Sequence, residues 1–135
     1  TLDIGEKYDI HPSNKHDVGY RLARFALKND YNKDIIVSGP LYKNISINED
    51  IIKVFFDYND NGLVLDEGEN SEFEIAGEDK NFIQANVVNQ GEYLEVFSEK
   101  FLSPKYVRYA WSDTSKATLF NAAGLPASSF SSENE

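Results

Sequence analysis

The apolar residues of this 135-residue chain follow two different periods, and the change between them constrains the fold more than any other feature. From residue 13 to residue 29 they recur every three to four residues, the period of one face of an amphipathic α-helix. After Lys33 they recur at every second residue, the period of a strand with one buried face. The sequence therefore predicts a helical segment within 1–33, a boundary at 31–34 and a β domain over 34–135.

The predicted helix has an apolar stripe on one side and charged residues on most of the other. The stripe consists of Val18, Leu22, Phe25 and Ala26. Asp17 and Arg21 have the four-residue spacing of an ion pair on a helix surface. If nothing else in the chain covers it, a stripe with an aromatic residue at its centre is an association surface. We therefore expect the helix to be poorly ordered or buried in a contact between two copies of the chain.

The β region predicts about eight short strands separated by turn residues, a pattern typical of an antiparallel β-sandwich. The predicted strands cover 35–38, 41–47, 52–58, 62–65, 73–75, 82–88, 93–97 and 106–111. The segment 128–135 is rich in serine and glutamate, and we expect it to fray.

The composition excludes several classes of protein. There are 23 acidic and 13 basic residues, a net charge of −10 that disfavours binding to a nucleic-acid backbone or an anionic membrane surface. The sequence has no apolar run of the ~20 residues that membrane insertion by a helix requires. It has no cysteine, which excludes thiolate metal sites and a cysteine nucleophile. It has no methionine either, so we expect a processed chain or part of a longer one.

The negative charge is concentrated in residues 57–79, which contain nine acidic residues and no basic one. A solvated, loop-rich edge accounts for this, and a cation site or a docking face are the alternatives. Residues 57–62 match the first six positions of a calcium loop, but Gly68 stands where the bidentate acid is expected, between Glu67 and Glu69. We therefore favour a turn at Asn61 and Gly62, and we expect no metal or other cofactor.

The chain has two histidines, and His16 is expected to be a solvated residue on the helix. His11 is in a different setting, because Asp9 stands two residues before it and the helix begins shortly after. An imidazole titrates near neutral pH, so a histidine oriented by a carboxylate on a loop can act as a general base. By itself, the local pattern is more often an exposed turn that carries a histidine with no role in catalysis.

Five segments in order along the chain resemble the motifs of one family. They are D-I-H-P-S-N-K at 9–15, S-G-P-L-Y at 38–42, F-E-I-A-G at 73–77, V-R-Y-A-W at 107–111 and G-L-P-A-S at 124–128. In these segments the chain resembles the sialate O-acetylesterase (sialic-acid-specific 9-O-acetylesterase) family of SGNH-type esterases. The resemblance implies that 1–33 is the end of an upstream α/β SGNH hydrolase domain, and that 34–135 is an accessory β-sandwich.

The resemblance also implies serine-esterase chemistry, in which a serine attacks the acetyl carbonyl and a histidine accepts its proton. His11 matches the catalytic histidine of the family, and Asp9 is the candidate acid that orients it. Many SGNH enzymes have the acid three residues before the histidine, where this chain has Tyr8. Asp9 therefore orients His11 from another angle, or a backbone carbonyl does so in a Ser–His dyad. None of the twelve serines lies in a nucleophile motif, so we expect the nucleophile upstream of this chain.

Aromatic residues of the β region have two interpretations. Trp111, Tyr109, Tyr106 and Tyr93 are core residues of a sandwich or a platform on which sugars stack. Arg108 lies on the opposite strand face from its neighbours Val107 and Tyr109. It pairs with a glutamate of a neighbouring strand or with the carboxylate of sialic acid.

Two functions follow from the sequence. The first is the C-terminal part of a carbohydrate O-acetylesterase that deacetylates O-acetylated sialic acid, inactive by itself because it lacks the nucleophile. An acetylxylan-type parent enzyme is equally compatible with this chemistry. The second is a non-catalytic β-sandwich that binds glycan or stabilises a partner domain. The resemblance implies a periplasmic or secreted protein.

Overall fold

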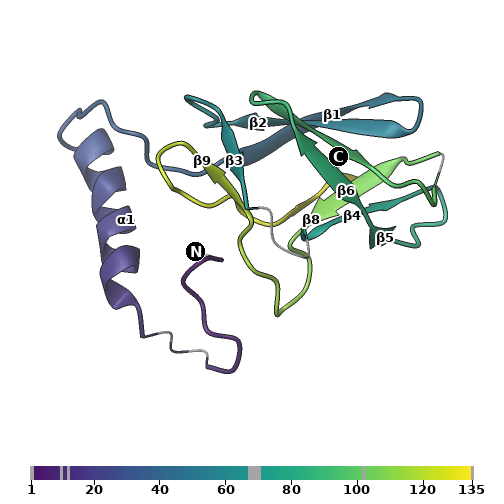
Figure 1. The fold of residues 1–135 in the computed structure, drawn as a ribbon. Helices are drawn as coiled ribbons and strands as arrows, with labels where there is room; N and C mark the ends of the chain where they lie inside the picture. The colour runs from purple at the N-terminus through teal and green to yellow at the C-terminus, as the bar shows by residue number, and fades with distance from the viewer. Residues whose placement is uncertain (1, 10, 12, 67–70, 102, 135) are drawn as a thin grey trace.

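The computed structural model describes residues 2–9, 11, 13–66, 71–101 and 103–134, and it contains one α-helix followed by a mainly β region (Figure 1). The helix α1 covers Lys15–Asn29. The strands are β1 (Leu41–Asn48), β2 (Ile51–Asp57), β3 (Leu63–Leu65), β4 (Phe73–Ala76), β5 (Ile83–Gln84), β6 (Asn86–Asn89), β7 (Tyr93–Phe97), β8 (Tyr106–Tyr109), β9 (Leu119–Asn121) and β10 (Phe130–Ser131). A 3₁₀ turn, η1, covers Ser132–Asn134. The predicted fold class, an antiparallel β-sandwich preceded by one helix, is confirmed.

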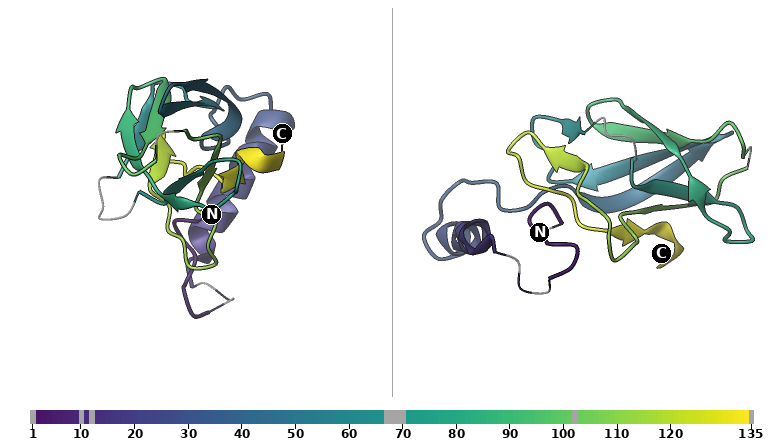
Figure 2. Two further views of the ribbon diagram at one scale, coloured as in Figure 1. Left: turned by 90° about the vertical axis from the view of Figure 1, so that its right-hand side faces the viewer. Right: turned by 60° about the horizontal axis from the view of Figure 1, so that its bottom comes forward.

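Two four-stranded antiparallel sheets form the layers of the sandwich (Figures 1 and 2). Their strand orders are β1-β2-β7-β6 and β10-β8-β4-β5, and β3 pairs with β9 in a separate two-stranded sheet. Side chains alternate between buried and more exposed along the central strands, as the period of two predicts. The buried residues of these strands are Ile52, Val54 and Phe56 of β2, Leu94 and Val96 of β7, Phe73, Ile75 and Ala76 of β4, and Val107 and Tyr109 of β8.

An aromatic cluster around Tyr109 lies at the centre of the core. The Tyr109 ring centroid is 4.7 Å from that of Phe73 and 5.8 Å from that of Phe130. Its hydroxyl oxygen accepts hydrogen bonds from the backbone N–H groups of Thr118 (2.8 Å) and Leu119 (3.0 Å). Tyr109 therefore buries a large apolar ring and also determines where β9 begins.

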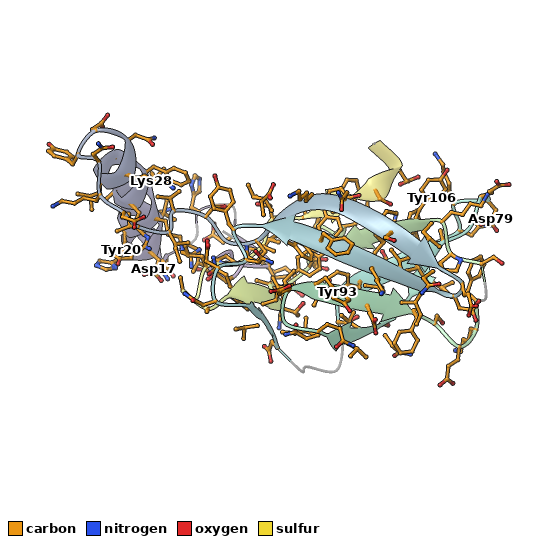
Figure 3. All side chains as sticks on the ribbon, turned by 90° about the horizontal axis from the view of Figure 1, so that it is seen from above. Asp17, Tyr20, Lys28, Asp79, Tyr93 and Tyr106 are labelled. Atoms are coloured by element: carbon orange, nitrogen blue, oxygen red, sulfur yellow. The ribbon has the colours of Figure 1, made fainter. Side chains whose placement is uncertain are left out.

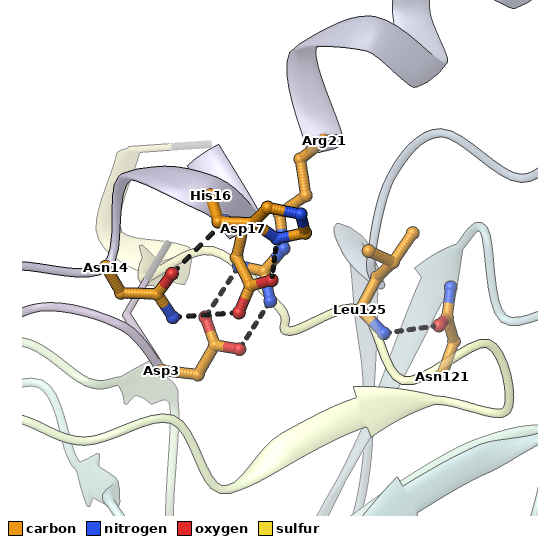
Figure 4. Close-up of polar contacts among 7 residues, drawn as sticks. All are labelled: Asp3, Asn14, His16, Asp17, Arg21, Asn121 and Leu125. Carbon is orange, nitrogen blue, oxygen red and sulfur yellow. Dashed lines mark hydrogen bonds and ion pairs between the residues drawn. The ribbon is translucent and has the colours of Figure 1, made fainter. Parts of the chain in front are cut away.

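Asn14 caps the start of the helix, since its side chain accepts a hydrogen bond from the backbone N–H of Asp17 at 3.2 Å. The orientation of the helix was not predicted. The partner of Arg21 is Asp3, which accepts two hydrogen bonds from the guanidinium at 2.7 and 2.5 Å, in place of the expected Asp17 (Figure 4). These bonds hold the pKa of the Asp3 carboxyl below its usual range. Arg24 donates to the carbonyl oxygen of Ile36 at 2.7 Å through its Nε.

The polar side of α1 thus faces the rest of the chain, and most of the apolar stripe does not. Leu22 is 65% exposed and Phe25 is 44% exposed. Figure 3 shows the helix at one end of the molecule, and Figures 1 and 2 show the N-terminal segment between the helix and the sheets. The helix forms without burying Leu22 and Phe25 within this chain, and its order and any contact between two copies stay predictions. Within the described part of the chain, no helix is long and apolar enough to span a membrane.

Three predicted features of the β region are wrong. The segment 35–38 is not a strand, although Val37 is buried in it. The single strand predicted at 82–88 is divided between β5 and β6, which belong to different sheets. The division occurs at Ala85, whose N–H donates to the carbonyl oxygen of Phe73 at 3.0 Å. The segment expected to fray contains β10, because Phe130 packs into the aromatic core and pairs in register with Tyr109.

The segment between the helix and β1 is docked onto the sandwich through Asn121 and Gly39. The buried Asn121 side chain donates to the carbonyl oxygens of Ser38 (2.9 Å) and Tyr58 (3.1 Å). A Cβ atom on Gly39 would lie against the carbonyl oxygen of Pro126, well inside van der Waals contact. Glycine is required here for close packing of two backbones rather than for an unusual φ. The boundary at 31–34 stays a prediction.

We predict that Gly39→Ala lowers the melting temperature of the chain by at least about 4 °C, because the new methyl group must push two backbone segments apart. The measurement is thermal unfolding followed by circular dichroism. Gly5→Ala is the matched control, since a Cβ atom there has nothing within 4 Å. Equal melting temperatures for the two variants would contradict this packing of residues 35–40 on the sandwich.

Candidate functional site

The loop that contains His11 is closed at its base by Glu6 and Ser13. The Glu6 carboxylate accepts hydrogen bonds from the Ser13 backbone N–H at 2.8 Å and from the Ser13 hydroxyl at 2.6 Å. Glu6 also forms an antiparallel bridge with Asp9. Ile10 and Pro12 of the predicted motif lie outside the described residues. His11 is therefore on a short exposed loop with its two ends tied together.

Asp9 and His11, the two site residues predicted from the sequence, lie next to each other in this loop. Asp9 Oδ1 accepts a hydrogen bond from the backbone N–H of His11 at 2.8 Å. Both residues are exposed. The Asp9 carboxylate thus contacts the main chain of His11, so Asp9 shapes the turn that presents the imidazole. Its role as the acid that orients the ring stays a prediction, as does the role of His11 in catalysis.

Glu6 is a residue of this site that sequence reasoning missed. The two hydrogen bonds from Ser13 favour the charged carboxylate and hold its pKa below the usual range of a glutamic acid. The residues are seven apart in a loop, a spacing that no periodic pattern marks. The contact appears only when the loop is folded.

His16 is a solvated helix residue, as expected. Its side chain is 90% exposed, and Nδ1 lies 3.5 Å from Asp17 Oδ1 (Figure 4). The pKa of Asp17 is lowered mainly by its hydrogen bond from the Asn14 side chain and then by His16. The histidine sits outside the loop closed by Glu6 and Ser13, so only His11 is a candidate base.

A hollow of about 420 Å³ separates this loop from the sandwich. We call it the loop hollow. Its lining on the loop side includes Glu6 and Lys7, and its lining on the sandwich side consists of 113–116 and the pair Ser128 and Ser129. Lys7 and Lys116 contribute cations, Glu6 and Asp113 contribute carboxylates, and the remaining sandwich residues contribute hydroxyl groups. The hollow is of a size and polarity that suit a small hydrophilic ligand.

The aromatic residues considered as a sugar platform do not form one surface. Tyr109 belongs to the core, as its alternation indicates. Tyr93 and Tyr106 are half-buried on strands of different sheets, and Figure 3 labels both. Trp111 is 48% exposed and follows β8. Of the two interpretations, the core one thus holds for Tyr109 and does not hold for Trp111.

Arg108 makes the structural ion pair that the strand pattern predicts. Its Nε donates to Glu74 Oε2 at 2.6 Å, and the two residues are register partners on β8 and β4. Its guanidinium also lies 4.0 Å from the centre of the Phe82 ring. Arg108 is therefore held in place by a carboxylate and an aromatic ring of its own sheet.

The segment resembling a calcium loop is a turn. The Asn61 backbone has a φ of 61° and that of Gly62 a φ of 98°, and the Gly62 N–H donates to the carbonyl oxygen of Asn59 at 2.8 Å. Asp57 is 3.5 Å from the ammonium of Lys43. Among the described residues there is no group of three or more acids or histidines that could hold a metal ion. Glu67, Gly68 and Glu69 lie outside those residues.

The fold is similar to that of a solved carbohydrate acetylesterase from Xanthomonas citri, with a TM-score of 0.89 and 36% sequence identity. The similarity covers 96% of this chain and 31% of that chain, so this chain spans about a third of the enzyme's length. The sequence matches no family model and no curated protein.

We predict that the Glu6 carboxyl titrates below the usual pH range of a glutamic acid and that Ser13→Ala raises its pKa towards that range. The closed loop is therefore fully formed at neutral pH and opens as the pH falls through the lowered pKa of Glu6. Carboxyl chemical shifts measured by NMR as a function of pH test this. A Glu6 pKa that Ser13→Ala does not change would contradict the proposed closure.

Proposed function

We propose that this chain is part of a carbohydrate O-acetylesterase and that it contributes His11 as the general base. The observation that carries the proposal is the similarity to a carbohydrate acetylesterase over 96% of this chain. The second support is the resemblance of the 9–15 segment to the block that contains the catalytic histidine of such esterases.

The chemistry of an acetyl ester defines what His11 does. A serine hydroxyl forms a bond to the acetyl carbon while the imidazole of His11 accepts the serine proton. Collapse of the tetrahedral intermediate breaks the bond to the sugar oxygen, which leaves with the proton from His11. Water then attacks the acetyl-enzyme with the same imidazole as base and releases acetate. The loop closed by Glu6 and Ser13 supports this role, because it presents His11 to solvent at a defined place.

The nucleophile belongs to a part of the protein that precedes Thr1 in this proposal. Two observations support it. None of the twelve serines has a nucleophile motif, and the similar enzyme is about three times as long as the matched region. The hydrogen-bond donors that stabilise the oxyanion would come from the same part.

O-acetylated sialic acid is the substrate that we propose first. The family resemblance points to it, and the two lysines of the loop hollow, Lys7 and Lys116, can attract the carboxylate of this sugar. An acetylated xylan is the second candidate, since Glu6 and Asp113 balance those charges. Such substrates occur outside the cytoplasm, so a periplasmic or secreted location is part of the proposal.

A non-catalytic role in stabilising a partner domain is the alternative function. The exposed positions of Leu22 and Phe25 favour it, because an ordered helix with an uncovered apolar stripe suits packing against another domain. In the esterase proposal that domain is the rest of the enzyme. The two functions thus differ in whether His11 takes part in chemistry.

We predict that His11→Ala lowers kcat for an acetylated sugar by about 10²- to 10⁴-fold in a form of the protein that includes the proposed nucleophile. Asp9→Asn should cost much less, because an amide oxygen can still accept the bond from the His11 N–H. If Asp9 instead orients the imidazole through its charge, Asp9→Asn should lower kcat by about 10⁴-fold. Steady-state kinetics of acetate release measures both.

The 135-residue chain alone provides the control for this experiment, since it should release no acetate from a simple acetyl ester. Saturable turnover by this chain that a serine-directed inhibitor abolishes would place the nucleophile among its own serines. Full activity of the His11→Ala variant would end the catalytic proposal.

We predict that Leu22→Ser combined with Phe25→Ser leaves the melting temperature of the sandwich nearly unchanged, because both side chains are exposed. In the chain alone the two changes should weaken any self-association through the helix, which sedimentation velocity measures. Val107→Ser, in the core, is the contrasting variant and should lower the melting temperature strongly. If the helix variant lowered the melting temperature as much as Val107→Ser does, the stripe would belong to the core of the sandwich.

A further inference from the structure

A second, smaller hollow of about 150 Å³ lies on the outer face of the β10-β8-β4-β5 sheet and is bordered by Trp111. We call it the Trp111 hollow. Its other lining residues are Glu72, Glu74, Gln84, Ser112 and Ser115. Glu74 and Gln84 are register partners on β4 and β5, so adjacent strands support this wall. The hollow has no role in the chemistry assigned to His11.

The exposure of Trp111 is a consequence of the backbone at Ala110. Strand alternation from the buried Tyr109 would place Trp111 on the inner face of the sheet. Ala110 has a φ of 50°, in the left-handed region that alanine rarely adopts, and this interrupts the alternation. Its N–H donates to the carbonyl oxygen of Glu72 at 2.9 Å, and Glu72 itself has a φ of 60°. Two residues with left-handed backbones thus hold the indole at the surface. Backbone strain of this kind is often found at functional sites.

The chemistry of the Trp111 hollow suits one sugar ring better than other ligands. The C–H face of a pyranose stacks on an indole, while carboxylates, an amide and hydroxyls are hydrogen-bond partners for its hydroxyl groups. Anionic ligands are disfavoured, because the wall includes the Glu72 carboxylate and the chain has a net charge of −10. A cation is disfavoured too, because Arg108 already neutralises Glu74 at 2.6 Å.

The Trp111 hollow and the loop hollow are neighbours. Ser115 lines both of them, and the loop hollow extends to Glu6 and Lys7, next to the His11 loop. Figure 1 shows the segment between β8 and β9 extending on the side where the N-terminal segment lies. A saccharide that occupies the Trp111 hollow can therefore continue past Ser115 into the loop hollow.

We propose that the Trp111 hollow is a binding subsite for a neutral pyranose, which holds the sugar next to the acetylated one. The substrate is then an oligosaccharide or polysaccharide rather than a free acetylated monosaccharide. The position of the subsite relative to His11 rests on the proposed function, whereas the binding of sugar at Trp111 does not.

The 135-residue chain itself is suited to the test, because Trp111 is its one tryptophan and its fluorescence reports on this hollow alone. Xylohexaose is the neutral probe, and lactose and 3′-sialyllactose form a pair that differs by the acidic sugar. We expect xylohexaose to change the Trp111 emission in a saturable way. We also expect 3′-sialyllactose to bind no more tightly than lactose. An emission that none of the three sugars changes, or clear preference for sialyllactose, overturns the proposal.

Variants measured by calorimetry locate the binding. Trp111→Ala should weaken xylohexaose binding at least about tenfold, and Trp111→Phe should recover part of it. Gln84→Ala should weaken binding while it retains the fluorescent reporter. Tyr93→Ala, a half-buried aromatic on the other sheet, is the control and should bind as the unchanged chain does. Circular dichroism melting shows whether each variant is folded. If Trp111→Ala does not fold, Gln84→Ala still tests the proposal.

Release of acetate from 4-nitrophenyl acetate by the longer form separates this proposal from the esterase proposal. Loss of sugar binding with esterase activity intact overturns the subsite alone. Sugar binding at Trp111 in a protein without esterase activity overturns the esterase proposal alone.

Discussion

The buried side chain of Asn121 is the interaction on which the arrangement of this molecule depends. It donates to the carbonyl oxygens of Ser38 and Tyr58, and it accepts from the Leu125 N–H at 3.1 Å (Figure 4). One amide thus joins the segment after the helix, the end of β2 and the turn after β9. The Asn121 side chain is itself buried, and a buried amide without such partners would be costly in free energy. Close packing of Gly39 on Pro126 adds to the same junction.

This junction places the His11 loop beside the sandwich. The segment 35–40 is held on the sandwich, Arg24 binds the Ile36 carbonyl, and Arg21 binds Asp3. These polar contacts position the N-terminal segment so that the loop hollow forms between Glu6 and Lys7 on one side and 113–116 on the other. Residues of the sandwich thereby become part of the surroundings of the candidate site.

The outer surface of the sandwich combines rigid support with exposed recognition groups. Arg108 is fastened to Glu74 and Phe82, and the left-handed backbone at Ala110 turns Trp111 outward from the core strand that precedes it. The aromatic cluster of Phe73, Tyr109 and Phe130 supports this strand from the inside. A ligand at Trp111 would thus meet a preorganised surface, which reduces the entropy lost on binding.

Features that depend on local periodicity were accessible from the sequence by itself. The stripe from Val18 to Ala26 predicted the helix, and alternation in β2, β7 and β8 predicted the sandwich, because side-chain burial on one face imposes a period along the chain. The His11 loop was found by resemblance to known motifs. The tertiary structure decided the partner of Arg21, the division of 82–88 at Ala85, the burial of Phe130, the clamp by Glu6 and the exposure of Trp111. These depend on contacts between residues far apart or on a single backbone angle, and neither leaves a periodic trace in the sequence.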